Sequence, residues 1–203
     1  TGRPVTLIAT TPAAYVDNKM YRMVEEAREN GLNIMPQMAG RPTGVLHGLQ
    51  SNFHVFVGHP TFSQLADLPL PELVAKMQDP AIKAQILSED SRFQNGRMAD
   101  LDSYLGMVFP LGDIPNYEPD FEQSVAGIAK AQNREPLDVM YDLLTDSDGK
   151  ELFYQPLGGY ANYNLEGQRM MMQHPNVLMG LSDGGAHCGV IADAGMPTFI
   201  LTH

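Results

Sequence analysis

Cysteine is nearly absent from this chain of 203 residues, in which Cys188 is the only one. A single thiol cannot form an internal disulfide, so cysteine usage does not point to an oxidising compartment. Long apolar runs are missing too, because no stretch approaches the roughly 18 consecutive apolar residues that a membrane-spanning helix requires. The first residues also lack the basic-then-apolar order of a signal peptide. We therefore expect a soluble, cytoplasmic protein with no membrane partner.

Basic residues are few, with 13 Lys and Arg against 24 Asp and Glu and a formal net charge of -11. Nucleic-acid affinity depends on clustered Lys and Arg, so the sequence predicts no nucleic-acid partner. The share of hydrophobic residues is 43% and that of charged residues 18%. These values are typical of an ordinary globular domain with a sizeable core. The chain opens on a strand-like run without Met and stops without cap or turn residues, so we expect part of a longer protein.

Residues 1–43 carry the pattern of one parallel strand-helix-strand unit. The run at 4–10 is apolar and β-branched, which is typical of a strand buried on both faces. Apolar residues at a helical period follow over 16–27, with Glu and Arg on the other side. The pair Asn30-Gly31 ends this helix, and a second strand begins at 32–37.

Residues 44–163 break this alternation and predict a largely helical insertion punctuated by proline. We expect helices over 70–77, from Asp120 with Gln123 in a capping box, and after Pro136. Short extended segments are expected at 104–111 and 152–156. Residues 164–203 then predict a final helix, a strand over 177–181 and a loop that follows it.

Asp183 is the strongest candidate for chemistry. It follows the apolar strand at 177–181, and α/β barrels place their reacting groups at the carboxyl ends of their strands. A carboxylate there can bind a metal or transfer a proton as general base. The alternative is that Asp183 caps the turn before Gly184. His187, four residues later, is a candidate ligand, substrate-binding group or positive charge.

Gln37 and Arg41 bracket the end of the second strand, so both are candidates to face the same cavity as Asp183. A guanidinium is suited to gripping a substrate carboxylate with two hydrogen bonds. The alternative for Arg41 is a surface salt bridge. No role is assigned to the four other histidines of the sequence before His187, which are His47, His54, His59 and His174.

Several familiar site motifs are excluded. The sequence contains neither His-x-His nor His-Glu-x-x-His, so it offers no compact pair of metal ligands. The stretch 146–149 resembles a calcium loop but lacks the carboxylates at its first and last ligand positions, which predicts a turn. Cys188 stands beside His187, yet adjacent residues rarely reach the geometry of a nucleophile and its base.

An ordered series of blocks resembles the D-aminoacylase-type (N-acyl-D-amino-acid deacylase) branch of the amidohydrolase superfamily. The most specific block is Leu-Ser-Asp-Gly-Gly-Ala-His at 181–187. Further blocks extend the resemblance over essentially the whole chain, at 2–6, 37, 41–44, 48–49, 109–113, 117–119, 164–165, 193–194, 197–198 and 201–203.

This resemblance implies an α/β fold, a partial (β/α)8 barrel with strands six to eight and a largely helical insertion between the last two. It implies hydrolysis of an N-acyl (D-)amino acid or a related C–N bond with zinc or another divalent metal, and Asp183 as metal ligand and catalytic group. The His-x-His of the first barrel strand is absent from this chain, and residues 9–11 are Ala-Thr-Thr where other members carry His. One carboxylate is too few to hold such a metal, so we expect the isolated chain to be inactive and metal-free.

The sequence is compatible with other functions as well. The chain could be a non-catalytic module on a degenerate amidohydrolase scaffold, which binds a partner through the insertion or a small acid around Arg41. Hydrolysis through Cys188 is a third and weaker hypothesis. An unclosed barrel exposes strand edges and an apolar face, so self-association is also expected.

Overall fold

The computed structural model describes residues 2–9, 19–91, 100–181, 187, 189–191 and 193–203. The chain divides into two compact units, unit 1 (Thr1–Gly44 and Pro156–His203) and unit 2 (Val45–Gln155). Its mixture of helices and strands confirms the predicted α/β class. The described strands form two three-stranded sheets and no closed barrel, so the partial barrel stays a prediction. In the described ranges, no helix is long and apolar enough to cross a membrane.

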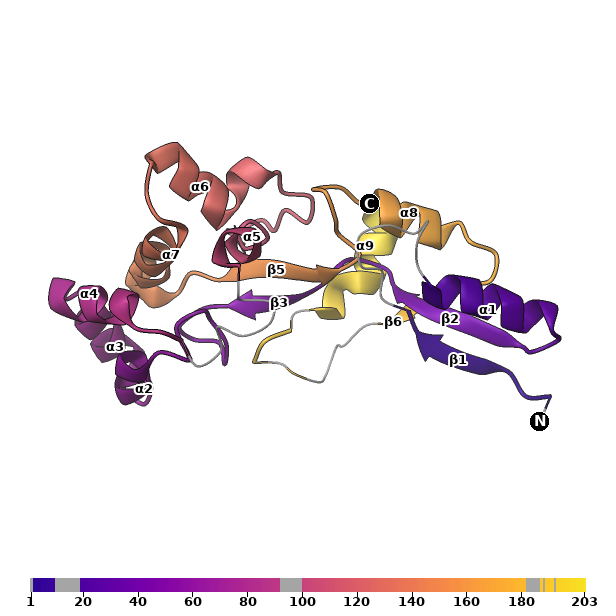
Figure 1. Ribbon diagram of the computed structural model, residues 1–203, viewed down its shortest axis with the longest axis horizontal. Coiled ribbons are helices and arrows are strands. Elements are labelled where there is room, and N and C mark those ends of the chain that lie inside the picture. The colour runs from indigo at the N-terminus through magenta and orange to yellow at the C-terminus, as the bar shows by residue number, and fades with distance from the viewer. Residues whose placement is uncertain (1, 10–18, 92–99, 182–186, 188, 192) are drawn as a thin grey trace. The chain divides into compact units, whose positions relative to one another are not determined.

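Unit 1 is built on a sheet of three parallel strands, β1 (Val5–Ile8), β2 (Ile34–Ala39) and β6 (Leu178–Leu181). Their spatial order is β1-β2-β6, so β2 is central and pairs with segments from both ends of the chain (Figure 1). Gln37 lies opposite Ile8 on one side and Leu178 on the other. The parallel strand-helix-strand unit predicted at the start of the chain is confirmed.

Helices cover one face of this sheet. Helix α1 (Lys19–Glu29) follows β1, and α8 (Glu166–Met172) precedes β6. Met38 of β2 packs in a buried cluster with Tyr21 of α1 and Met171 of α8. Successive side chains of a strand point to opposite faces, so Gln37 faces away from these helices. After β6 the chain continues into a 3-10 turn, η5 (Asp193–Gly195), and helix α9 (Met196–Thr202).

The expectation that the first strand is buried on both faces is wrong. Val5 is 51% exposed and Ile8 is 59% exposed. Among the described strands, β1 pairs with β2 alone and therefore has an open edge. Leu178 and Met179 of β6 are exposed as well. The apolar composition of these strands suits a buried environment that the described part of unit 1 does not provide.

Unit 2 is mainly helical. Its helices are α2 (Pro60–Leu65), α3 (Leu70–Met77), α4 (Pro80–Ser88), α5 (Leu101–Leu105), α6 (Val125–Gln132) and α7 (Pro136–Thr145). The described part of unit 2 also contains the 3-10 turns η3 (Phe121–Gln123) and η4 (Ser147–Gly149). A second sheet, with order β3-β5-β4, is formed by β3 (Thr43–His47), β5 (Phe153–Gly158) and β4 (Phe109–Pro110). The predicted insertion at 44–163 overlaps unit 2, and its role as an insertion into a barrel stays a prediction.

The core of unit 2 is a single apolar cluster to which most of its helices contribute. The predicted helices over 70–77 and after Pro136 are confirmed, and Met77, Met140 and Leu144 are fully buried. Tyr141 of α7 donates its hydroxyl proton to the carbonyl oxygen of Met77 at 2.8 Å. The polar atom of this buried ring is thereby satisfied.

The helix expected to begin at Asp120 is split in two. Asp120 and Gln123 do form a capping box, but it encloses only the short turn η3. Ser124 then caps α6, because its hydroxyl oxygen accepts a hydrogen bond from the backbone N–H of Gly127 at 3.0 Å. Two adjacent caps thus start two separate helical segments. The predicted extended segment at 104–111 is also shorter in the structure, where only β4 is a strand.

Gly127 offers a test of how tightly η3 packs on α6. A Cβ atom at this position would lie 2.1 Å from the carbonyl oxygen of Phe121, a backbone atom that cannot move alone. We expect Gly127→Ala to lower the free energy of unfolding by about 1–3 kcal/mol because of this overpacking.

The matched control is Gly167→Ala in α8, where a Cβ atom meets nothing within 4 Å. Because alanine favours helix, this control should raise the free energy of unfolding by about 0.5–1 kcal/mol. Urea unfolding followed by circular dichroism measures both variants. Equal stability of the two would contradict the described packing of α6 on η3.

Candidate functional site

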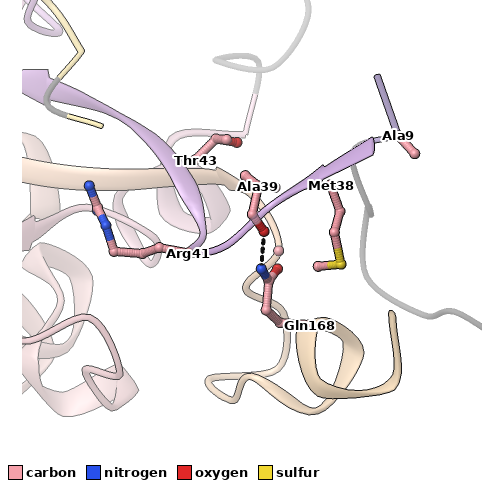
Figure 2. Close-up of a pocket in the computed structure, with 8 residues that line it drawn as sticks. Ala9, Met38, Ala39, Arg41, Thr43 and Gln168 are labelled. Atoms are coloured by element: carbon pink, nitrogen blue, oxygen red, sulfur yellow. Dashed lines mark hydrogen bonds between the residues drawn. The ribbon is translucent and has the colours of Figure 1, made fainter. Parts of the chain in front are cut away.

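The carboxyl ends of β1 and β2 meet at a small cavity in unit 1 (Figure 2). Parallel sheets of α/β proteins carry their reacting groups at this edge. The cavity volume is about 10 Å³, which is room for about one water molecule. The hollow is thus a gap beside a possible site and cannot hold a substrate as it stands. Its lining consists of Ala9, Met38, Ala39, Arg41, Thr43, Gly158, Gly159 and Gln168.

Arg41 follows β2 and is almost completely buried, at 1% exposed. Its Nη2 lies 3.3 Å from Oδ1 of Asp193, which is equally buried at the start of η5. Figure 2 shows the Arg41 side chain extending away from Gln168 and Met38. The ion pair expected as one alternative does form, but it is buried instead of lying at the surface. In this arrangement the guanidinium faces a carboxylate of its own chain, and its substrate-binding role stays a prediction.

Gln168 of α8 fixes the end of β2 from the helical side. Its Nε2 donates a hydrogen bond to the carbonyl oxygen of Ala39, drawn as the dashed line in Figure 2. Gly159 makes this approach possible, because a Cβ there would lie 2.5 Å from Oε1 of Gln168. The φ angle of Gly159 is +83°, in the left-handed region that glycine adopts most easily. The local backbone therefore demands glycine at this position.

Gln37 belongs to the other face of the sheet and does not line the cavity beside Arg41. It is partly buried, and a Cβ on Gly180 of β6 would lie 3.5 Å from its Oε1. The absence of a side chain at Gly180 leaves space next to the Gln37 amide. The common cavity predicted for Gln37, Arg41 and Asp183 stays a prediction, because Asp183 lies outside the described residues.

His187 is exposed and has a left-handed backbone with φ of 55°. Its carbonyl oxygen accepts hydrogen bonds from the backbone N–H groups of Val190 and Ile191, both at 2.9 Å. These contacts form a local turn and leave the imidazole on the surface. The substrate-binding role of His187 stays a prediction.

A metal centre would need several well-placed ligands. Within the described residues, no group of three or more His, Cys, Asp or Glu side chains is arranged to hold an ion. The donor set present in these residues therefore does not fit a zinc site. Cys188 lies outside them.

The contacts made by Asp193 and Gln168 escaped prediction from the sequence. Asp193 is separated from Arg41 by 152 positions, and no periodicity links the two. Gln168 is a polar residue on a short helix, where glutamine is ordinarily a surface residue. The glycine pair at 158–159 is the sequence signal that could have pointed to a close approach there, since a Cβ on Gly159 would lie 2.5 Å from Oε1 of Gln168.

Comparisons of the chain with models of protein families, with curated proteins and with solved structures find no match. A family assignment accordingly depends on the residues of the chain and on the geometry described above.

The buried ion pair generates a stability prediction. Asp193→Ala removes the carboxylate that the buried Arg41 guanidinium faces, so we expect the free energy of unfolding to fall by about 3–5 kcal/mol. The double variant Arg41→Met/Asp193→Ala should lose less than the sum of the two single variants, since neither charge is then left behind.

The control is the exposed pair of Arg169 and Glu166 on α8, 2.5 Å apart. Arg169→Met should change stability little, because solvent screens such pairs. Chemical unfolding measures all of these variants. An Arg41 variant as stable as the Arg169 variant would show that the described pair is not formed.

Proposed function

We propose that this chain supplies the sixth to eighth strands of a (β/α)8 barrel in a D-aminoacylase-type amidohydrolase. The observation that carries the proposal is the parallel order β1-β2-β6, in which β2 and β6 are neighbours although unit 2 separates them in the sequence. In such barrels consecutive strands are adjacent and parallel, and a helix precedes each next strand. Helix α1 precedes β2 and α8 precedes β6, as this architecture requires.

The proposed reaction is hydrolysis of the amide bond of an N-acyl (D-)amino acid or of a related C–N bond. Asp183 follows β6 by two residues in the sequence, at the end of a barrel strand where reacting groups are found. In this role its carboxylate accepts a proton from the attacking water. The same proton then passes to the leaving amine as the C–N bond breaks. Gln37, Arg41 and His187 are the candidates for binding the substrate.

Zinc or another divalent ion, when bound, would polarise the scissile carbonyl group and the water. The chain itself does not provide a complete set of ligands, since it contains no His-x-His. One carboxylate is too few for a stable divalent site. We therefore propose that the 203-residue chain alone is inactive and that the remaining ligands belong to other strands of the barrel.

A second candidate function is a non-catalytic binding module on a degenerate amidohydrolase scaffold. One observation favours it. Ala9 directly follows β1, where other members of the resembled family carry His, and packs in an apolar cluster with Met38. In this case a partner or a small acid would be the ligand, and an acid that binds Arg41 would have to displace Asp193.

The enzymatic proposal predicts a loss of turnover when Asp183 is replaced. A longer natural chain that contains this segment is expressed with zinc and assayed on N-acyl-D-amino acids. Asp183→Ala should lower kcat on the order of 10²–10⁴-fold, the usual contribution of a general base.

The control is Asp67→Ala, which replaces an exposed aspartate of unit 2. Its turnover should match that of the unchanged enzyme. Undiminished turnover of the Asp183 variant refutes its catalytic role. No turnover by any chain, together with binding of an N-acyl amino acid without metal, favours the binding module.

We also propose that the isolated chain self-associates through the sheet of unit 1. Exposed strand edges and apolar side chains such as Ile8 favour pairing with another copy. Size-exclusion chromatography with light scattering should show dimers or larger species. Ile8→Lys should shift the chain toward monomer, because a charge on an edge strand opposes pairing.

Ile114→Lys is the matched control, since Ile114 of unit 2 is an isoleucine that is 89% exposed. It should leave the association unchanged. A monomer at all concentrations for the unchanged chain, or an equal effect of the two lysine variants, would rule out association through β1.

A further inference from the structure

Three of the six histidines are buried in unit 2 and come from one short segment. His47, His54 and His59 are each at most 3% exposed. They lie between the end of β3 and the start of α2. No role was predicted for these three histidines from the sequence. The other histidines differ, because His187 and His203 are exposed and Nε2 of His174 in unit 1 lies 3.1 Å from Oε1 of Glu25, within hydrogen-bond distance. The three buried histidines can therefore be compared with histidines of the same chain that lie in other surroundings.

His47 is held as a neutral ring. Its Nε2 donates a hydrogen bond to Oε1 of Gln155 at 3.0 Å. Among the described residues, its buried Nδ1 has no hydrogen-bond partner. The ring packs at 4.9 Å from Phe53 and at 6.0 Å from Tyr104. A proton on Nδ1 would therefore be a buried donor that faces aromatic rings.

His54 uses its unprotonated nitrogen to hold the backbone. The N–H of Phe56 donates to Nδ1 of His54 at 3.2 Å. The ring stands edge-on against Phe62 of α2, with centroids 4.5 Å apart. Protonation of Nδ1 removes this acceptor and places a charge among apolar groups. Burial, together with the charges that His47 and His59 would carry, lowers the pKa of His54 to about 3.

His59 packs against the Phe56 ring at 5.3 Å. The carboxylates near it are Glu89 and Asp90, which follow α4, and Glu89 is already engaged by the N–H and hydroxyl of Thr61. Burial lowers the pKa of His59 in spite of these carboxylates. Burial likewise lowers the pKa of His47 to about 4, against the effect of the hydrogen bond to Gln155.

We propose that unit 2 is acid-sensitive, because segment 47–59 leaves the core when its three histidines take up protons, and unit 2 opens. The segment supplies Val55 and Phe56 to the apolar core. Its departure therefore removes packing from the whole unit.

The pH dependence of opening follows from the linkage between histidine protonation and the opening of unit 2. The open form binds protons at the ordinary histidine pKa of 6.5. In the closed form burial lowers the pKa of His47 to about 4 and that of His54 to about 3, and it lowers the pKa of His59 as well. Stability of the closed form is complete above pH 6.5 and falls as the pH decreases toward the lowered values. Each histidine multiplies the opening constant by up to about tenfold per pH unit in this window, so three histidines give up to about 10³-fold.

Carboxyl groups also affect the pH dependence of stability, but at lower pH than the histidines, so the two effects can be separated. A hydrogen bond from Lys83 holds the pKa of Asp138 in α7 below its usual range, so this carboxyl group stays ionised where histidines take up protons. Measurements between about pH 5 and 7 therefore report mainly on histidine.

The experiment is an NMR titration of the full chain over this range. The imidazole signals of the three buried histidines should stay unshifted until the amide signals of unit 2 weaken together. The opening constant is obtained from hydrogen exchange of core amides such as that of Met140.

In His54→Asn, the amide oxygen can still accept from the Phe56 N–H, but the side chain cannot be protonated. In this variant the opening constant should rise by up to about 10²-fold per pH unit of acidification, a factor of ten less than in the unchanged chain. The control His174→Gln, which changes a histidine of unit 1, should leave the increase unchanged. If His54→Asn does not fold, the test passes to His47→Gln, whose side-chain amide can still donate to Gln155.

Two results would overturn the proposal. One is titration of any buried histidine between pH 6 and 7 while the amide signals of unit 2 persist. The other is the same pH dependence of opening in the His54 or His47 variant as in the unchanged chain.

Discussion

The parallel pairing of β2 with β6 is the constraint on which unit 1 depends. Of the described strands of unit 1, β2 alone has neighbours on both sides. Two further attachments converge where it ends, next to its last pairing with β6. The carbonyl oxygen of Ala39 accepts from Gln168, Ala39 lies opposite Leu181, and Arg41 binds Asp193. Residues 39–41 thus join α8, β6 and η5 to one strand end, the edge at which the proposed site would be built.

The two units differ in how far they bury their apolar side chains. Unit 2 encloses one continuous apolar core and even places three neutral histidines inside it. In the described part of unit 1, helices cover one face of the sheet, and Val5, Ile8 and Met179 are exposed. A strand of this composition is stabilised when its second face is covered, which is what additional barrel strands or a second copy would do. The ion pair of Arg41 and Asp193 has little net stabilising value in such a place, and its geometric effect of fixing η5 is the more important one.

Local patterns predicted local structure well, and long-range contacts were beyond them. The helical period before Asn30-Gly31 and the proline at 136 located α1 and α7 because both signals act within a few residues. The capping box at Asp120 was correctly identified, yet Ser124 is an equally good cap and starts its own helix. The partner of Arg41 could not be found, because a buried ion pair between distant residues leaves no periodic trace. The exposure of β1 was not predicted, because the apolar composition of a strand indicates which environment would stabilise it. It does not show whether neighbouring elements provide that environment.

The most direct test of this account is the register of β6 on β2. Nuclear Overhauser contacts between the backbone protons of residues 37–39 and 178–181 measure it without any substitution. The account predicts the parallel pattern, with Gln37 opposite Leu178 and Met38 opposite Met179. A spectrum in which β2 shows contacts to β1 alone, or an antiparallel pattern to β6, would contradict the barrel-strand order and the site proposed at its edge.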